Sequence, residues 1–431
     1  MAKKFTFKSE FVKNVATVMT GTALSQVVAL GATPILTRFY APRDFGFLVI
    51  YLSMLSVVGT ISTGKFERAI LLVSKKGTIN RIVFLSFAIS LVVSFFLFFL
   101  LVVLKDFLLR TLDFSVEFYT WLFTLPILII IYSFYTVFNV ILNYQKRFKR
   151  LAAAKLIKTI SSVSVSLTCI LFLNDARGLI LAEIIGYILA AVFVVAANLN
   201  SFDFGKKVRK DAFQVANRFK DFPLFNVPSD FMNMASNQMP VFFLTTYLGP
   251  SVAGFYSLMK RVMDAPVNLF STSILEVFRQ KASEQYIRNG ECKMLFIQTA
   301  KNLSVMAVIP FTVLFILAPE LFSLVFGEEW RLAGEYAKIF SVFYFFKFIS
   351  SPLTYMFFIA EKQRLNFVIH SYIFCSSLII LNLPRFVKLD DKGMLWFYCI
   401  NFVLIYLVYF LISYKLASGK INKTARGGNN I

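Results

Sequence analysis

The hydrophobic positions of the chain form long runs separated by short polar segments. Each run is close to the length of about 20 apolar residues that a helix needs to cross the hydrocarbon core of a bilayer. The pattern predicts about twelve transmembrane helices, near residues 14–36, 45–64, 82–104, 116–142, 152–173, 178–199, 224–247, 252–278, 297–318, 334–360, 365–387 and 392–414. The backbone is not tolerated unpaired in lipid, so we expect an all-α integral membrane protein.

The basic residues are distributed unevenly between the predicted loops. Most Lys and Arg residues fall at the N-terminus, in every second loop and in the C-terminal tail. The positive-inside rule then predicts that both termini are cytoplasmic, with an even number of helices between them. We expect an N-terminal six-helix bundle over 1–199, a basic cytoplasmic linker over 200–223, a C-terminal six-helix bundle over 224–414 and a basic cytoplasmic tail over 415–431.

Two short segments of the chain are similar to each other. The segment LTRFYAPRDFGF starts at Leu36, and LTTYLGPSVAGF starts at Leu244, with Leu, Thr, Pro, Gly and Phe in register. Each segment forms the corner between two consecutive predicted helices. Six predicted helices separate the two corners, so both are expected on the outer side of the membrane. This favours two parallel six-helix repeats, an architecture known from transporters. The alternative is that two unrelated helix hairpins share Pro and Gly because both residues suit a corner.

Composition narrows the possible functions. The chain of 431 residues is 58% hydrophobic and 17% aromatic and carries a formal net charge of +22. The basic residues lie in loops, so the charge does not indicate a nucleic-acid partner. We find no P-loop, no metal-ligand spacing among the four cysteines, and a single histidine, His370, which we interpret as a packing residue. We therefore expect no enzyme activity and no cofactor, with energy from an H⁺ or Na⁺ gradient or from the substrate gradient.

Polar side chains inside the predicted helices mark a candidate cavity. Four polar residues of the 224–247 helix follow a 4-3-4 spacing and share one face, and the next helix places Lys260 and Asp264 one turn apart. The candidate cavity residues are Gln26, Glu67, Arg68, Asn226, Asp230, Asn233, Asn237, Lys260, Arg261, Asp264 and Lys347. Two alternatives stay open: Asn, Ser and Thr often serve helix packing, and Glu67 and Arg68 are also interpretable as interfacial anchors.

Lys347 is the most distinctive of these residues. It lies near the centre of the 334–360 helix. A lysine at this depth costs about 3 kcal/mol on insertion scales, and from the centre it snorkels only partly. We therefore expect Lys347 to face water or a carboxylate.

Several blocks of the sequence are similar to a known family. The blocks are ILTRFYAPRDFGFLVIYLS with FERAILL, LNYQKRFKRLAAAKLIK, the long segment from FPLFNVPSDFMNMASNQMP to VFRQKASE, and FGEEWRLAGEYAKIFSVFYFF. In this order and spacing they resemble the Wzx-type oligosaccharide-lipid flippases of the MOP (multidrug/oligosaccharidyl-lipid/polysaccharide) exporter superfamily.

The resemblance implies both an architecture and a function. It implies two six-helix bundles in a MATE-like V around a cation-lined lumen, which Lys260, Arg261 and Lys347 would fit. The implied function is to flip undecaprenyl-pyrophosphate-linked sugar repeat units across the bacterial cytoplasmic membrane by alternating access. The product would be O-antigen of lipopolysaccharide, capsule or another surface polysaccharide, and a polymerase and a chain-length regulator would be partners.

Two alternative functions would require different features in the sequence. A MATE-type drug or cation antiporter of the same superfamily would favour carboxylates over lysines in its cavity. A polysaccharide polymerase or ligase would need a large outer loop, whereas every predicted outer loop is short. The lysines favour a lipid-linked oligosaccharide, because its pyrophosphate is anionic and is bound by Lys and Arg.

Overall fold

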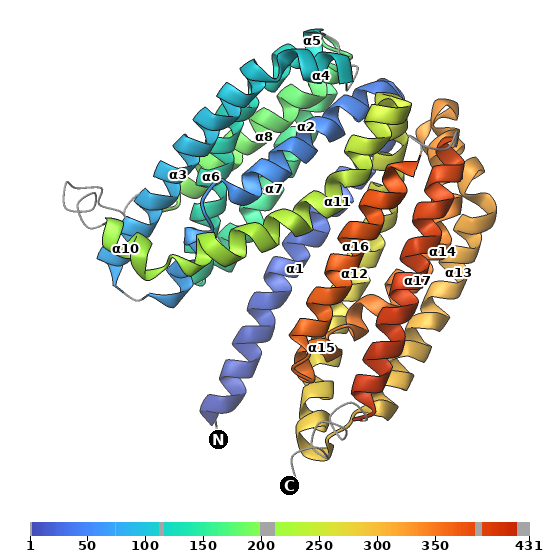
Figure 1. Ribbon diagram of the computed structural model, residues 1–431. Coiled ribbons are helices and arrows are strands. Elements are labelled where there is room, and N and C mark those ends of the chain that lie inside the picture. Colours follow the sequence, from blue (N-terminus) through green and yellow to red (C-terminus); the bar gives the residue numbers. More distant parts are fainter. Residues whose placement is uncertain (1, 74, 112–115, 199–211, 384–389, 420–431) are drawn as a thin grey trace. The chain divides into compact units, whose positions relative to one another are not determined.

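The computed structural model describes residues 2–73, 75–111, 116–198, 212–383 and 390–419 (Figure 1). Over these residues the regular structure is helical throughout, as the sequence predicts. The chain divides by its contacts into two units, Met1–Gly254 and Phe255–Ile431. Residues 200–211 of the expected linker and 420–431 of the expected tail lie outside the described residues, whereas 212–218 of the linker form the helix α10. The division into two six-helix bundles therefore stays a prediction.

The first unit contains most of the shorter helices. Its elements are α1 (Ala2–Leu36), α2 (Pro42–Ile61), η1 (Phe66–Leu72), α3 (Lys76–Val103), α4 (Lys105–Thr111), α5 (Val116–Leu122), α6 (Leu125–Tyr144), α7 (Phe148–Cys169), α8 (Ala176–Ala196), α10 (Ala212–Arg218), η3 (Phe222–Asn226) and α11 (Val227–Leu248). Helix α7 packs against α1 and α8, α3 packs against α6, and α2 packs against α6, α8 and α11. Short η1 covers the buried end of α3 and α6 through Ala69 and Ile70, which are fully buried.

The second unit is built around α14. Helix α12 (Pro250–Asn289) begins at the end of the first unit and continues into the second. It is followed by α13 (Lys293–Phe326), η4 (Glu328–Trp330), α14 (Arg331–Leu353), α15 (Met356–Ile359), α16 (Gln363–Leu381) and α17 (Asp391–Ala417). Helix α14 packs against α13 and α17. Aromatic rings fill these contacts: Phe343 packs edge-on against Phe402 and Tyr406, with ring centroids 5.4 and 5.5 Å away.

Each of the twelve predicted spans coincides with helix. Ten segments of the described chain are long and apolar enough to cross a membrane. Helices α11 and α12 are not among these ten, because the polar stripes noted in the sequence lower their hydropathy. Helix α3 shows the opposite character, since its large side chains Phe95, Phe96 and Phe99 are exposed, as expected of a surface that faces lipid. The fold is that of a multi-pass membrane protein.

The two similar sequence corners lie in equivalent positions and touch each other. Pro42 is the first residue of α2 and Pro250 is the first residue of α12. The contact is reciprocal: a Cβ on Gly46 would lie 1.9 Å from the carbonyl oxygen of Pro250, and a Cβ on Gly254 would lie 1.9 Å from that of Pro42. Only glycine allows two helix ends to approach this closely. Residues at matching repeat positions therefore exchange contacts, as a local two-fold axis requires.

Candidate functional site

The helix α2 ends in a turn with an uncommon backbone conformation. Gly64 and Lys65 both adopt the left-handed region, with φ of 60° and 59°. Glycine does so freely, but for lysine this conformation costs about 1–2 kcal/mol. After the turn the chain forms a seven-residue 3-10 helix, η1, longer than such helices usually are. The turn breaks the helix and brings Lys65 and Arg68 to the face of α11.

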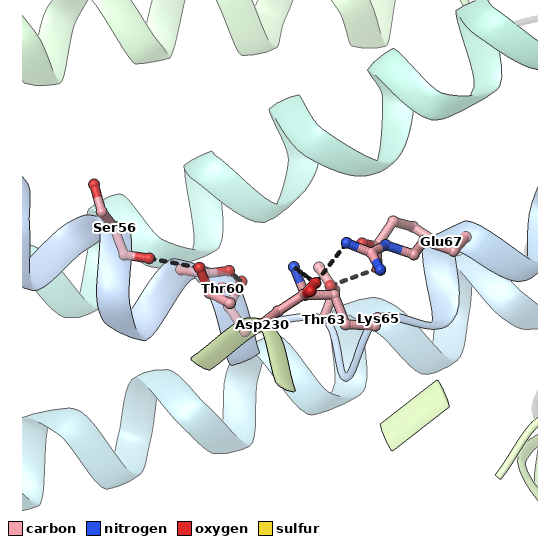
Figure 2. Close-up of polar contacts among 9 residues, drawn as sticks. Ser56, Thr60, Thr63, Lys65, Glu67 and Asp230 are labelled. Carbon is pink, nitrogen blue, oxygen red and sulfur yellow. Dashed lines mark hydrogen bonds and ion pairs between the residues drawn. The ribbon is translucent and has the colours of Figure 1, made fainter. Parts of the chain in front are cut away.

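These two cations meet one carboxylate. Figure 2 shows Asp230 of α11 pointing at this turn, with Lys65 beside it. Lys65 Nζ lies 3.1 Å from Asp230 Oδ2, and Arg68 Nη2 donates to the same oxygen. The side chain of Lys65 is 13% exposed, that of Asp230 28% and that of Arg68 45%. The cluster Lys65–Arg68–Asp230 is thus partly hydrated and carries one more positive than negative charge.

Glu67 lies beside this cluster but is bonded differently. Its side chain is buried at 4% exposure, and Thr63 Oγ1 donates a hydrogen bond of 2.6 Å to Glu67 Oε2. Figure 2 also shows a nearby bond in which the Thr60 hydroxyl donates to the Ser56 carbonyl oxygen. Glu67 is therefore a buried acceptor rather than an exposed anchor at the membrane surface.

The amide side chains on the predicted polar face of the 224–247 helix are arranged less tightly than the charged cluster. Asn237 Nδ2 donates to the backbone and side-chain oxygens of Asn233 at 2.9 and 3.2 Å, and both residues are exposed. Asn226 ends η3 and precedes the first turn of α11. In α1, Gln26 Oε1 is buried and has no hydrogen-bond partner within the described part of the chain. On α11, Gln238 accepts a 3.0 Å hydrogen bond from Ser53 of α2, which joins these two helices.

The second cluster is built around Lys347 in the second unit. Lys347 Nζ of α14 lies 2.7 Å from Asp264 Oδ1 of α12, and the hydroxyl of Tyr344 donates to the same oxygen at 2.9 Å. The ammonium also lies 4.7 Å from the centre of the Tyr344 ring. The side chain of Lys347 is 21% exposed and that of Asp264 is 23% exposed. Lys347 therefore faces a carboxylate, which is one of the two surroundings expected from its position in the sequence.

Lys260 adds a second cation to this cluster. It lies one turn before Asp264 on α12 and interacts electrostatically with both Asp264 and Lys347. Lys347, Lys260 and Asp264 together carry one net positive charge. Arg261 follows Lys260 in the chain and is half-buried. The three-residue cluster Lys260–Asp264–Lys347 therefore contains three of the predicted cavity residues.

An ion pair between α7 and α8 involves two residues that are not among the predicted cavity residues. Lys158 Nζ of α7 lies 2.5 Å from Glu183 Oε2 of α8, Ser162 Oγ donates to Glu183 Oε1 at 2.7 Å, and the ammonium lies 4.8 Å from the centre of the Tyr187 ring. Lys155, one turn earlier, donates to Thr22 of α1. Both lysines lie inside α7. Their position within the predicted 152–173 helix could have indicated that each lysine needs a polar partner.

Comparison with known proteins identifies the family. Residues 35–334 match the sequence profile of the polysaccharide biosynthesis protein family. A search of curated proteins finds no match.

Solved structures show the same fold at low identity. The lipid II flippase MurJ in an inward closed conformation matches with a TM-score of 0.70 at 14% identity, covering 92% of this chain and 87% of MurJ. An inward-facing multidrug resistance MATE family transporter of the MOP superfamily matches with a TM-score of 0.67 at 14% identity, over 94% and 96% of the two chains. A MOP superfamily transporter from Pyrococcus furiosus, described as having a binding pocket of reverse polarity, matches with a TM-score of 0.57 at 14% identity, over 94% and 96%. Since the family profile spans more than half of the chain, this protein belongs to the polysaccharide biosynthesis protein family, and it has the fold of the MOP superfamily transporters.

Proposed function

We propose that this protein is a flippase that moves undecaprenyl-pyrophosphate-linked oligosaccharide repeat units across the bacterial cytoplasmic membrane by alternating access. The observation that carries the proposal is that Asp264 is outnumbered by the two lysines around it, Lys347 and Lys260. A charged side chain at membrane depth is costly and is retained mainly for function. A net positive site of this kind suits an anionic substrate better than a cationic drug.

The chemistry of the substrate matches both clusters. A pyrophosphate carries several acceptor oxygens, and hydrogen bonds from Lys or Arg to such anions are about twice as strong as neutral ones. Lys65 and Arg68 supply a point charge and a planar donor fork, and Lys347 and Lys260 supply two point charges. Exposed amides such as Asn233 and Asn237 both donate and accept, as sugar hydroxyls require. The fold shared with a lipid II flippase supports a lipid-linked substrate.

The remaining parts of the proposal follow from this substrate. Both termini lie in the cytoplasm, coupling is to an H⁺ or Na⁺ gradient or to the substrate gradient, and the product feeds O-antigen, capsule or a related polysaccharide. A polymerase and a chain-length regulator act next on the flipped unit. The alternative of a MATE-type drug or cation antiporter is favoured by fold similarity alone, and the excess of lysines around Asp264 opposes it.

The decisive experiment is deletion of the gene in its native host. We expect surface polysaccharide to disappear and the undecaprenyl-linked repeat unit to accumulate on the cytoplasmic side, with both effects reversed by the wild-type gene. Drug sensitivity is measured in parallel as the readout of the alternative. Unchanged polysaccharide together with increased drug sensitivity would refute the flippase and support the antiporter.

A further inference from the structure

A groove lies between α12 and α13 of the second unit, further along α12 than the Lys260–Asp264–Lys347 cluster. It has a volume of about 500 Å³, within the range of small-molecule sites. Its lining comes from one stripe on each helix: Ile274, Val277, Phe278 and Lys281 on α12, and Leu295, Gln298, Thr299, Asn302, Leu303 and Met306 on α13. The stripe on α12 begins ten residues after Asp264, about 15 Å further along the helix at 1.5 Å per residue. The groove is therefore separate from the Lys260–Asp264–Lys347 cluster.

The groove is lined by Lys281 at one end, by polar side chains of α13 and by apolar side chains of both helices. Phe278 and Phe296 pack edge to face, with ring centroids 6.4 Å apart, which sets the two helices in register. This register places Lys281 at the end of the groove nearest the chain reversal between α12 and α13, the cytoplasmic end in the topology expected from the loop charges. Gln298 and Asn302 lie about one and two turns deeper, followed by Met306. The walls are the apolar side chains of Ile274, Val277 and Leu303.

The polar side chains of the groove are available to a ligand. Thr299 Oγ1 donates to the carbonyl oxygen of Leu295 on its own helix. Lys281, Gln298 and Asn302 are exposed, and no hydrogen bond or ion pair joins them to other residues in the described ranges. In hydrocarbon an amide without a partner costs several kcal/mol. Gln298 is the second residue of the predicted 297–318 span and the exposed Lys301 precedes Asn302, so both amides lie at the cytoplasmic boundary of the hydrocarbon. At this boundary a lipid head group is a polar partner that belongs to the membrane.

We propose that this groove binds an anionic phospholipid of the cytoplasmic leaflet. Lys281 at the mouth pairs with the phosphate, as basic pockets between helices on the cytoplasmic side do for anionic head groups. Gln298 and Asn302 hydrogen-bond the head-group hydroxyls and the ester oxygens, because an amide both donates and accepts. The apolar walls hold the first part of an acyl chain. A single lysine matches the single charge of a phosphodiester better than the higher charge of a pyrophosphate.

The test measures lipid retention by the purified protein. The full-length protein is placed in nanodiscs containing equal amounts of phosphatidylglycerol and phosphatidylcholine, released, and examined by native mass spectrometry. We expect the wild type to retain phosphatidylglycerol, and Lys281→Ala to retain about tenfold less. The matched control is Lys301→Ala, which removes an exposed lysine of α13 that does not line the groove, and this variant should retain as much as the wild type.

A second variant separates binding from folding. Gln298→Leu keeps the charge of Lys281 and replaces an exposed amide with an apolar side chain that suits a membrane helix, so we expect reduced retention at an unchanged melting temperature. Equal retention by wild type and Lys281→Ala would overturn the proposal, as would an equal loss in Lys301→Ala. An undecaprenyl-pyrophosphate glycolipid that is retained by the wild type and lost from Lys281→Ala would overturn the assignment of the occupant.

Discussion

The pairs Lys158–Glu183 and Lys347–Asp264 each join two membrane helices of this protein, and they differ in the hydrogen bonds that their carboxylates accept. In the Lys158–Glu183 pair, Lys158 and Ser162 donate to different oxygens of Glu183, and the glutamate side chain is 11% exposed. In the Lys347–Asp264 pair, Lys347 and Tyr344 donate to the same oxygen, Oδ1, and Asp264 is 23% exposed. Lys260 adds a further positive charge to the Lys347–Asp264 pair.

The difference distinguishes a structural ion pair from a site that is open to a ligand. A pair whose carboxylate is buried and accepts at both oxygens holds two helices in register, and removing one partner costs about 3–5 kcal/mol because the other charge is stranded. A cluster with an excess cation and partial exposure has electrostatic capacity for another anion. By this criterion Lys158–Glu183 joins α7 to α8, whereas Lys260–Asp264–Lys347 and Lys65–Arg68–Asp230 are the candidate substrate contacts.

The largest expected effect is that of Lys347→Ala on transport. We expect surface polysaccharide to fall at least a hundredfold when this variant complements a flippase-null strain, while protein abundance stays near normal because Tyr344 and Lys260 still stabilise Asp264. Lys347→Arg should keep part of the activity, since the charge remains and the donor geometry changes. Full complementation by Lys347→Ala at normal abundance would remove Lys347 from the mechanism.

The Lys158–Glu183 pair is expected to respond in stability rather than in transport. Glu183→Ala strands Lys158 and should lower the free energy of unfolding by about 3 kcal/mol, visible as a lower melting temperature in detergent. The double variant Lys158→Met with Glu183→Leu replaces both charges with apolar groups and should restore both melting temperature and transport. Loss of transport in a stable double variant would show that this pair, too, takes part in the mechanism.

For the Lys65–Arg68–Asp230 cluster we expect a smaller loss of transport than for Lys347. Arg68→Ala removes a half-exposed donor, so we expect little change in melting temperature and a loss of transport of about tenfold, the effect of one charge-assisted hydrogen bond. The matched control is Arg288→Ala, which removes an exposed arginine at the end of α12. Equal transport by the two variants would assign Arg68 a role at the surface only.

The smallest effect concerns the access of water to the two pairs. Single cysteines in place of Ser162 and Ser351, with Cys375 replaced by Ser, are compared by their rates of labelling with a small maleimide. Ser351 lies one turn after Lys347 and is half-buried, whereas Ser162 is buried beside Glu183, so we expect faster labelling at position 351. Equal rates would contradict the distinction between an open cluster and a closed pair.

The native thiol of Cys292 provides an internal reference for this experiment. Burial, reinforced by the charge of Glu291, raises the pKa of Cys292 to about 11. The thiolate is the reactive form, and its fraction at pH 7.5 is then on the order of a hundredfold lower than for an unperturbed thiol. Background labelling of Cys292 should therefore be slow at pH 7.5 and should rise with pH. Fast labelling at neutral pH would show that the α12–α13 reversal opens in solution.

The membrane fold was largely determined by local sequence. Hydropathy over windows of about 20 residues located a helix at each predicted span, because burial in lipid acts on the whole segment and does not depend on which helix lies beside it. The corner repeat was also readable, since Pro42 and Pro250 start helices wherever those helices pack. The depth of Lys347 likewise predicted a compensating partner without naming it.

Only the tertiary structure decided which charges meet. Asp264 lies 83 residues from Lys347, and Asp230 lies 162 residues from Arg68, so no periodicity within one helix connects them. The left-handed turn at Gly64 and Lys65 re-aims both Lys65 and Arg68, and a helical projection of α2 does not reveal this. Helix faces follow from a local period of 3.6 residues, whereas an ion pair depends on how two helices pack, and that packing is set by contacts summed over the whole interface.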